Sequence, residues 1–171
     1  MTALLSQEVL VVLAYGVGVE RVAVEIESRE CNVGKARRFV REQLVRWGVP
    51  RDDELVDRVL LVVSELVTNA VLHARTRPQE EKEMVGVALA LKRDFGLGVI
   101  VSDNSCGIPL ENLRPSVNGS SGRGLVLVRA HSDGWTASPR CDGKGLIGKT
   151  VWAFFECPQL TVLPELIPQP A

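Results

Sequence analysis

The sequence predicts an α+β fold, in which a mixed, mostly antiparallel β-sheet and helices on one of its faces form a two-layer sandwich. Apolar residues return at three- and four-residue steps over residues 32–47 and 53–74, as they do in packed helices. Residues 22–27 and 85–91 alternate between apolar and small or polar side chains, which is the period of a strand. The apolar run at residues 97–101 follows residues 85–91 after a short connection, so these two strands should form an antiparallel hairpin.

The N-terminal residues are predicted to be strand-like. Residues 8–27 are rich in valine and carry Gly16 and Gly18 in the middle, which indicates one or two strands with a turn at the glycines. We therefore expect residues 1–21 to form an apolar N-terminal extension or an extra strand. The main domain should then span residues 22–158.

The two predicted helices have recognisable ends. Asn32 suits the N-cap of the first helix, and the run Gly48-Val49-Pro50 stops it. Asp52 or Asp53 can begin the second helix, which continues to about Ala74. The second helix is apolar on nearly every side, so it should be buried.

The C-terminal third should supply the remaining elements. A helix is expected from residue 124 to about residue 130, and strands are expected over residues 135–137 and 150–156. The proline-rich residues 159–171 should form a surface tail.

Composition and charge narrow the function classes. The 171-residue chain has a formal net charge of −1, whereas a dedicated nucleic-acid binder usually carries a basic excess. Its four cysteines form no Cys-x-x-Cys pair and it has two histidines, so no structural zinc site is predicted. The apolar run at residues 9–19 is shorter than the ~20 residues that span a membrane, and no basic residue precedes Arg21 as a signal peptide would require. We therefore expect a cytoplasmic protein that contacts neither nucleic acid nor membrane.

Three polar residues lie four positions apart within the second helix. Glu65, Asn69 and His73 should therefore share one face of an otherwise apolar helix. A buried carboxylate is costly unless a partner compensates it. The stripe is thus predicted to face a polar occupant, such as a metal ion with a bound phosphate ligand. The alternative is a core helix whose polar groups bond to neighbouring backbone.

The run Ser64-Glu65-Leu66-Val67-Thr68-Asn69-Ala70 resembles the N box of the GHKL ATPase superfamily. This superfamily contains gyrase, the Hsp-ninety chaperones, histidine kinases and the MutL mismatch-repair proteins, and its ATP-binding domain has the Bergerat fold. The resemblance implies that Glu65 is the catalytic residue, acting on water or a hydroxyl group, and that Asn69 holds magnesium. At His73, one turn further on, a structural role is expected.

A second motif stands at the end of a predicted strand. Asp103, Ser105 and Gly107 resemble the superfamily's D-x-G-x-G box, whose aspartate accepts a hydrogen bond from the exocyclic amine of adenine. Ser105 replaces the first glycine of the box, which makes the loop less free and weighs against tight ATP binding. Cys106, inside the box, is expected to be a small loop residue rather than a redox site.

Glycines lead into the next predicted helix. The run from Gly119 to Leu125 should leave free backbone N–H groups at a helix N-terminus, where the helix dipole also favours a phosphate. It resembles the superfamily's G-x-G-L box at the hinge of an ATP lid, and residues 109–121 would be that lid. The resemblance implies nucleotide contacts from four residues: Gly122, Arg123, Gly124 and Leu125.

The last motif, Gly148-Lys149-Thr150-Val151-Trp152, resembles the superfamily's terminal G-x-T strand. It implies that the Thr150 hydroxyl assists the adenine contact near Asp103. The four motifs occur in the order that the superfamily requires, and the chain resembles the small actinobacterial anti-sigma-factor serine kinases. ATP and Mg²⁺ are the implied cofactors. The implied partners are a STAS-domain anti-anti-sigma protein, phosphorylated on serine, and an RNA polymerase sigma factor, with a homodimer formed through the apolar N-terminal segment.

Three alternatives remain open at this point. A non-catalytic ATP-binding module could sequester a partner without transferring phosphate, as the serine at position 105 would allow. A catalytic domain split from a histidine kinase would need a long dimerisation helix with a phospho-accepting histidine, for which the chain has no room. A DNA-associated ATPase of the gyrase or mismatch-repair type would need large coupling domains.

Overall fold

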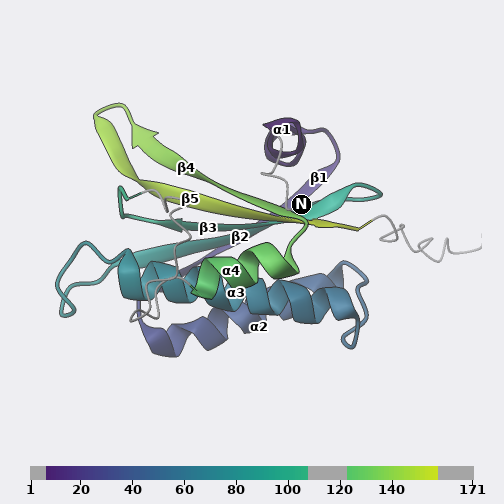
Figure 1. Ribbon diagram of the computed structural model, residues 1–171, viewed down its shortest axis with the longest axis horizontal. Coiled ribbons are helices and arrows are strands. Elements are labelled where there is room, and N and C mark those ends of the chain that lie inside the picture. Colours follow the sequence, from purple (N-terminus) through teal and green to yellow (C-terminus); the bar gives the residue numbers. More distant parts are fainter. Residues whose placement is uncertain (1–6, 108–122, 158–171) are drawn as a thin grey trace, which may run out of the picture.

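The computed structural model describes residues 7–107 and 123–157. In these ranges the chain forms helices and strands in the following order: α1 (Gln7–Tyr15), β1 (Val19–Glu27), the short 3-10 helix η1 (Glu30–Asn32), α2 (Val33–Arg46), α3 (Glu54–His73), β2 (Met84–Lys92), β3 (Gly96–Asp103), α4 (Arg123–His131), β4 (Gly134–Asp142) and β5 (Gly145–Glu156). Figure 1 shows one sheet, with α2, α3 and α4 together on one face and α1 on the other. The predicted α+β class is confirmed.

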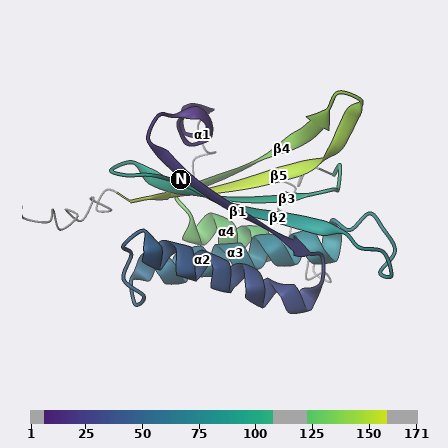
Figure 2. The same cartoon turned by 180° about the vertical axis from the view of Figure 1, so that it is seen from behind.

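The five described strands pair in the order β1-β2-β3-β5-β4, and every pairing among them is antiparallel. The sheet is therefore more uniform than the mixed sheet that the sequence predicted. Seen from behind, β1 forms one edge and β4 lies at the other (Figure 2). The central pairing of β3 with β5 places Asp103 opposite Lys149 and Ser102 opposite Thr150. This register decides which side chains of β5 face the helices.

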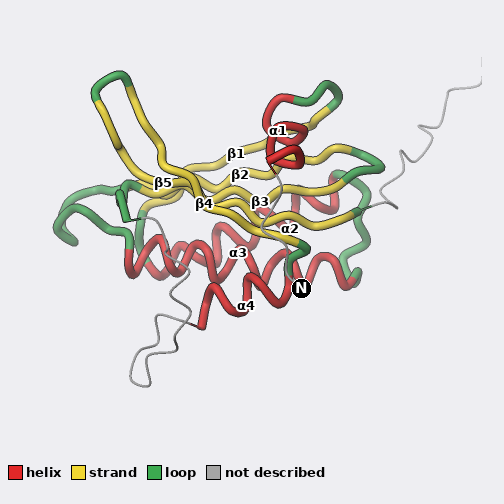
Figure 3. Tube along the Cα trace, turned by 45° about the horizontal axis from the view of Figure 1, so that its top comes forward, coloured by secondary structure: helices red, strands yellow, loops and turns green. Residues whose placement is uncertain are grey.

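The main core lies between the sheet and α2, α3 and α4. Figure 3 shows α3 and α4 below the sheet. Every second residue of the central strands points into this core, which is the period of 2 expected of a strand. These inward residues are fully or almost fully buried: Val87, Leu89, Val99, Val101, Val151 and Phe155. Each such side chain contributes about 1.5–3 kcal/mol relative to an exposed one, so this layer fixes α3 against β3.

Helix α3 begins and ends close to its predicted limits. The Asp53 side chain caps its N-terminus by accepting a hydrogen bond from the Leu55 backbone N–H at 2.8 Å. Asn32 stands at the N-cap of α2, as predicted, but its side chain does not cap that helix. Its Nδ2 instead donates to the Glu27 carbonyl oxygen at 2.9 Å, which ties η1 to the end of β1.

The prediction for the N-terminus was wrong in one respect: residues 7–15 form a helix rather than a strand. Leu13 is fully buried and packs with Val9 and Leu10 against Ala90 and the outer face of the sheet. Positions 9, 10 and 13 share one side of a helix, so this burial selects helix over strand. The predicted domain boundary at residues 21–22 also falls inside β1.

Helix α1 is held to the sheet by polar contacts as well. Arg21 Nη2 donates to the Leu13 carbonyl oxygen at 2.8 Å, and Lys92 Nζ donates to the Val17 carbonyl oxygen at the same distance. A β-carbon built on Gly98 would lie 3.0 Å from Leu13 Cδ1, so glycine in β3 makes room for the helix. Helices therefore cover both faces, not only the one predicted. No helix in the described ranges is long and apolar enough to cross a membrane.

Candidate functional site

A cavity of about 370 Å³ lies between α3, α4 and the ends of β3 and β5. Its apolar lining comes from Leu66, Ala70, Val101, Leu125 and Val151. Its polar lining comes from Asn69, His73, Asp103, Ser105 and Lys149, and Gly107 completes it. Apolar walls with a few convergent polar groups are the usual build of a small-molecule site, and the volume lies within the range of such sites.

The cavity brings together residues that the sequence placed in separate motifs. Asn69 comes from α3, Asp103 ends β3, Ser105 and Gly107 belong to the following loop, and Leu125 comes from α4. Asp103 reaches the cavity because it is in phase with Val99 and Val101 on the helix-facing side of β3. The fold thus explains how residues from motifs so far apart along the chain line one cavity.

The most strongly buried polar group in the cavity is a pair of opposite charges. Lys149 Nζ lies 2.9 Å from both carboxylate oxygens of Asp103, and the two side chains are 10% and 5% exposed. Burial raises the pKa of Asp103 above its ordinary value, although the Lys149 ammonium and the Ser105 backbone N–H act in the opposite direction. No sequence motif predicted a role for Lys149.

The register of β5 places the Thr150 side chain outside the cavity in which the sequence had predicted it. Thr150 Oγ1 is hydrogen-bonded to Ser102 Oγ at 3.0 Å, on the face of the sheet away from the cavity. Successive residues of a strand point to opposite faces, so Lys149 and Thr150 cannot both face the helices. Lys149 takes the position next to Asp103 that the sequence had assigned to the threonine hydroxyl.

Gly148 permits this close approach. A β-carbon at position 148 would collide with the backbone carbonyl of Asp103 and lie 3.0 Å from the Cα of Asn104. Only glycine lets β5 pass the end of β3 at this distance. On the other side, Arg140 Nη1 donates to the Asp103 carbonyl oxygen at 3.2 Å. The backbone around the carboxylate is therefore fixed from two strands.

Ser105 is accommodated in the loop without left-handed backbone. Its N–H donates to Asp103 Oδ1 at 2.9 Å, and its hydroxyl accepts from the Gly107 N–H at 3.2 Å. Both are short-range side chain–backbone bonds of the kind that stabilise turns. Neither Ser105 nor Gly107 has a positive φ, so serine replaces the expected glycine at no backbone cost here.

The start of α4 lies directly against the polar stripe of α3. A β-carbon built on Gly124 would lie 3.0 Å from both Asn69 Nδ2 and Glu65 Oε2. Glu65 and Asn69 are half-buried, and Asn69 lines the cavity whereas Glu65 does not. His73 also lines the cavity, at its exposed end. The N-terminal backbone of α4 is thus placed beside Asn69, where an anionic ligand would meet the helix dipole.

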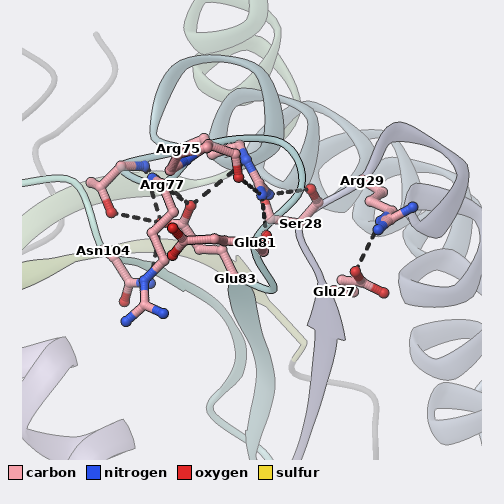
Figure 4. Close-up of polar contacts among 10 residues, drawn as sticks. Glu27, Ser28, Arg29, Arg75, Arg77, Glu81, Glu83 and Asn104 are labelled. Carbon is pink, nitrogen blue, oxygen red and sulfur yellow. Dashed lines mark hydrogen bonds and ion pairs between the residues drawn. The ribbon is translucent and has the colours of Figure 1, made fainter.

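A second cluster of polar contacts surrounds Glu83 and includes Asn104, in the loop after β3 (Figure 4). The Glu83 carboxylate is buried and accepts bonds from the Thr76 N–H and hydroxyl, from the Arg77 N–H and from Asn104 Nδ2. Burial opposes ionisation of Glu83, but these hydrogen bonds outweigh it and lower the pKa of Glu83. Since Asn104 follows Asp103, this cluster positions the carboxylate of the cavity.

Arg75 extends the same cluster to Ser28, the residue that follows β1. Its guanidinium donates to the carbonyl oxygens of Ser28, Pro78 and Glu81, and Nε lies 3.9 Å from Glu83 Oε2 (Figure 4). Hydrogen bonds from this one arginine therefore hold the connection between α3 and β2 together.

Two parts of the predicted phosphate site remain to be placed. Gly122 and the expected lid at residues 109–121 lie outside the described residues. Arg123 is the first residue of α4, and its predicted contact with phosphate stays a prediction.

The sheet with its helical layer, the carboxylate at the end of β3 and the helix N-terminus beside Asn69 together define a nucleotide-binding domain of the ATPase type. A family model of the histidine kinase-like ATPase domain matches residues 26–152, which is most of the chain. The chain belongs to this family, and the membership supports ATP binding. A search of curated proteins found no match.

Proposed function

We propose that the protein binds ATP with Mg²⁺ in this cavity and transfers the γ-phosphoryl group to a serine of a partner protein. The observation that carries the proposal is the convergence of Asp103, Asn69 and the α4 N-terminus on one cavity. Adenine would lie on Asp103 between the apolar walls. The phosphates would lie along Asn69 and the backbone at Gly124.

The residues present fit a magnesium ion held largely by the nucleotide. The described residues contain no group of three or more acidic, histidine or cysteine side chains that would form a metal cage. Mg²⁺ commonly keeps several waters and is shared between one or two protein oxygens and the substrate phosphates. The amide oxygen of Asn69 would supply such a ligand, and the ion would neutralise phosphate charge.

Glu65 is the proposed general base. In the transfer, the serine hydroxyl oxygen forms a bond to the γ-phosphorus, its proton goes to the Glu65 carboxylate, and the bond to the β-phosphate oxygen breaks to release ADP. Phosphoryl transfer depends mainly on positioning and charge neutralisation, which α3 and α4 would provide. Glu65 must reach the substrate past Gly124, against which it lies.

The proposed partners are a STAS-domain anti-anti-sigma protein, as phosphate acceptor, and an RNA polymerase sigma factor, held inactive by binding. Support comes from the motif sequences around Glu65, Gly124 and Lys149, which are similar to those of the anti-sigma-factor serine kinases. A cytoplasmic homodimer is part of the same proposal. Val11 and Tyr15 of α1 are exposed apolar side chains that such a dimer could cover.

The test is phosphorylation of a candidate STAS protein with γ-labelled ATP and Mg²⁺, together with nucleotide titrations. Glu65→Gln should keep ATP affinity within about threefold and reduce label transfer at least 100-fold, the usual scale of a lost general base. Asn69→Ala should weaken magnesium-dependent ATP binding at least tenfold. Ser64→Ala serves as the control on the same helix, because the Ser64 hydroxyl donates to the Leu60 carbonyl oxygen within that helix and Ser64 does not line the cavity.

The competing function is a non-catalytic ATP-binding module that sequesters its partner. One observation favours it: Glu65 packs against Gly124 and does not line the cavity. Measurable ATP binding without label on any partner would establish the module. Full transfer by Glu65→Gln would remove Glu65 from the mechanism, and undiminished ATP binding by Asn69→Ala would refute the metal site.

A further inference from the structure

The carboxylate predicted to read adenine is already engaged by a cation from the neighbouring strand. Lys149 Nζ lies 2.9 Å from Oδ1 and from Oδ2 of Asp103, and both residues line the cavity. The pairing of β3 with β5 places them directly opposite each other. Any base that reaches Asp103 must therefore meet the ammonium as well.

Counting donors and acceptors shows what this pair can still bind. A carboxylate has about four acceptor positions, and two of those on Asp103 are occupied, because Lys149 Nζ and the Ser105 N–H both donate to Oδ1. The ammonium has three N–H donors, one of which is directed at the Asp103 carboxylate. Among the described residues no further acceptor is bonded to it. Acceptor positions on Oδ2 and at least one N–H donor of Lys149 thus remain, on two groups that lie 2.9 Å apart.

We propose that Lys149 is a second base-reading residue, which donates a hydrogen bond to N1 of adenine while Asp103 accepts one from the N6 amine. Adenine presents this donor next to this acceptor on a single edge, so the pair is its complement. The inference rests on the proposed ATP binding and specifies how the base is selected. It replaces the role that the sequence had assigned to Thr150.

The apolar, water-shielded surroundings increase the contribution of this hydrogen bond to nucleotide affinity. Val101, Val151 and Leu66 wall the cavity with apolar surface, and the charged pair is almost fully shielded from water. A hydrogen bond to a charged group is worth more than a neutral one, and leaving a buried donor unpaired costs its desolvation. We therefore expect the contact to change nucleotide affinity by roughly tenfold or more.

The experiment compares ATP with 1-deaza-ATP, in which a C–H group replaces N1, for three forms of the full chain in the presence of Mg²⁺. Wild type should bind ATP at least tenfold more tightly than 1-deaza-ATP. Lys149→Met should bind ATP and 1-deaza-ATP with about equal affinity, because it removes the donor that N1 requires. Lys92→Met is the matched control: it removes a lysine whose Nζ donates to the Val17 carbonyl oxygen outside the cavity, so the preference should stay at the wild-type value.

Lys149→Gln is the second variant, should Lys149→Met fail to fold. It keeps an N–H donor and should retain a preference for ATP of at least threefold. An equal preference in wild type and Lys149→Met would overturn the inference. Tighter ATP binding by Lys149→Met would also overturn it, because the lysine would then occupy the place of the base. If wild type binds neither nucleotide, the proposed ATP site itself fails, which is a separate result.

Discussion

At the scale of single residues, Gly124 is the place where α4 lies against the polar side chains of α3. The missing β-carbon leaves space for the side chains of Glu65 and Asn69, both of which would otherwise lie about 3 Å from it. The glycine is therefore required by the site and not by the helix, since glycine is a poor residue within a helix.

We predict that Gly124→Ala weakens ATP binding about tenfold or more, because the added methyl group displaces Asn69 from its position. The measurement is a nucleotide titration. Gly34→Ala is the control: Gly34 lies on the exposed side of α2, with no neighbouring atom within 4 Å of an added β-carbon. That variant should bind ATP like wild type and gain up to about 1 kcal/mol of stability. Equal ATP affinity in both variants would contradict the proposed contact.

Single residues also show where sequence reasoning succeeded and where it could not. The four-residue spacing of Glu65 and Asn69 was sufficient, because helix geometry alone puts them on one face. Which side chains of β5 face the helices could not be predicted in the same way. Trp152 and Phe154 on its outer side are as apolar as Val151 and Phe155 on its inner side, so the strand shows no alternation in polarity.

At the scale of elements, that missing signal has a physical cause. The outer face of β5 is apolar because Phe154 and Trp152 pack with α1, which covers the sheet from the other side. The sequence suggested a strand for α1, since valine-rich residues favour strands. Tertiary packing of Leu13 over Ala90 and Gly98, which the local sequence does not reveal, favours a helix there. The strand predicted for residues 7–15 and the uncertain facing of the β5 side chains thus have the same cause, the packing of α1 on the sheet.

The connection between α3 and β2 depends on the ionised form of Glu83. Its lowered pKa means that the folded state favours the carboxylate, so the stabilisation is fully present above the ordinary value of 4.5. It is lost as the pH falls through the lower pKa of the folded protein. Stability from this group therefore rises with pH across that acidic window and stays constant above it.

We predict that Glu83→Gln lowers the free energy of unfolding by about 1–3 kcal/mol at pH 7, because a neutral amide cannot accept four N–H and O–H donors. The difference from wild type should shrink as the pH is lowered below 4.5. Urea unfolding between pH 3 and pH 7 measures both effects. Glu80→Gln, an exposed neighbour in the same connection, should change stability by less than about 0.5 kcal/mol. A difference that is independent of pH would show that the charge of Glu83 has no role.

At the scale of the whole molecule, one continuous core joins the inner face of the sheet to α2, α3 and α4. The sheet and the helices on its inner face could be predicted, because periodicity in the sequence indicates these elements. The helix on the outer face could not, because it depends on contacts between residues far apart along the chain. Cys157, directly after β5, belongs to this core, while Cys31, Cys106 and Cys141 are exposed. The four thiols therefore differ in their accessibility to solvent.

We predict three fast thiols and one that reacts only when the whole domain unfolds. Burial raises the pKa of Cys157 to about 12, so at pH 8 only about one molecule in ten thousand carries the reactive thiolate there. Labelling with a chromophoric disulfide reagent should modify three thiols within minutes. The fourth should react along the same urea transition as the circular dichroism signal. Cys157→Ser should remove the slow reaction and leave the three fast ones. Four fast thiols in native protein would show that the end of β5 opens independently of the core.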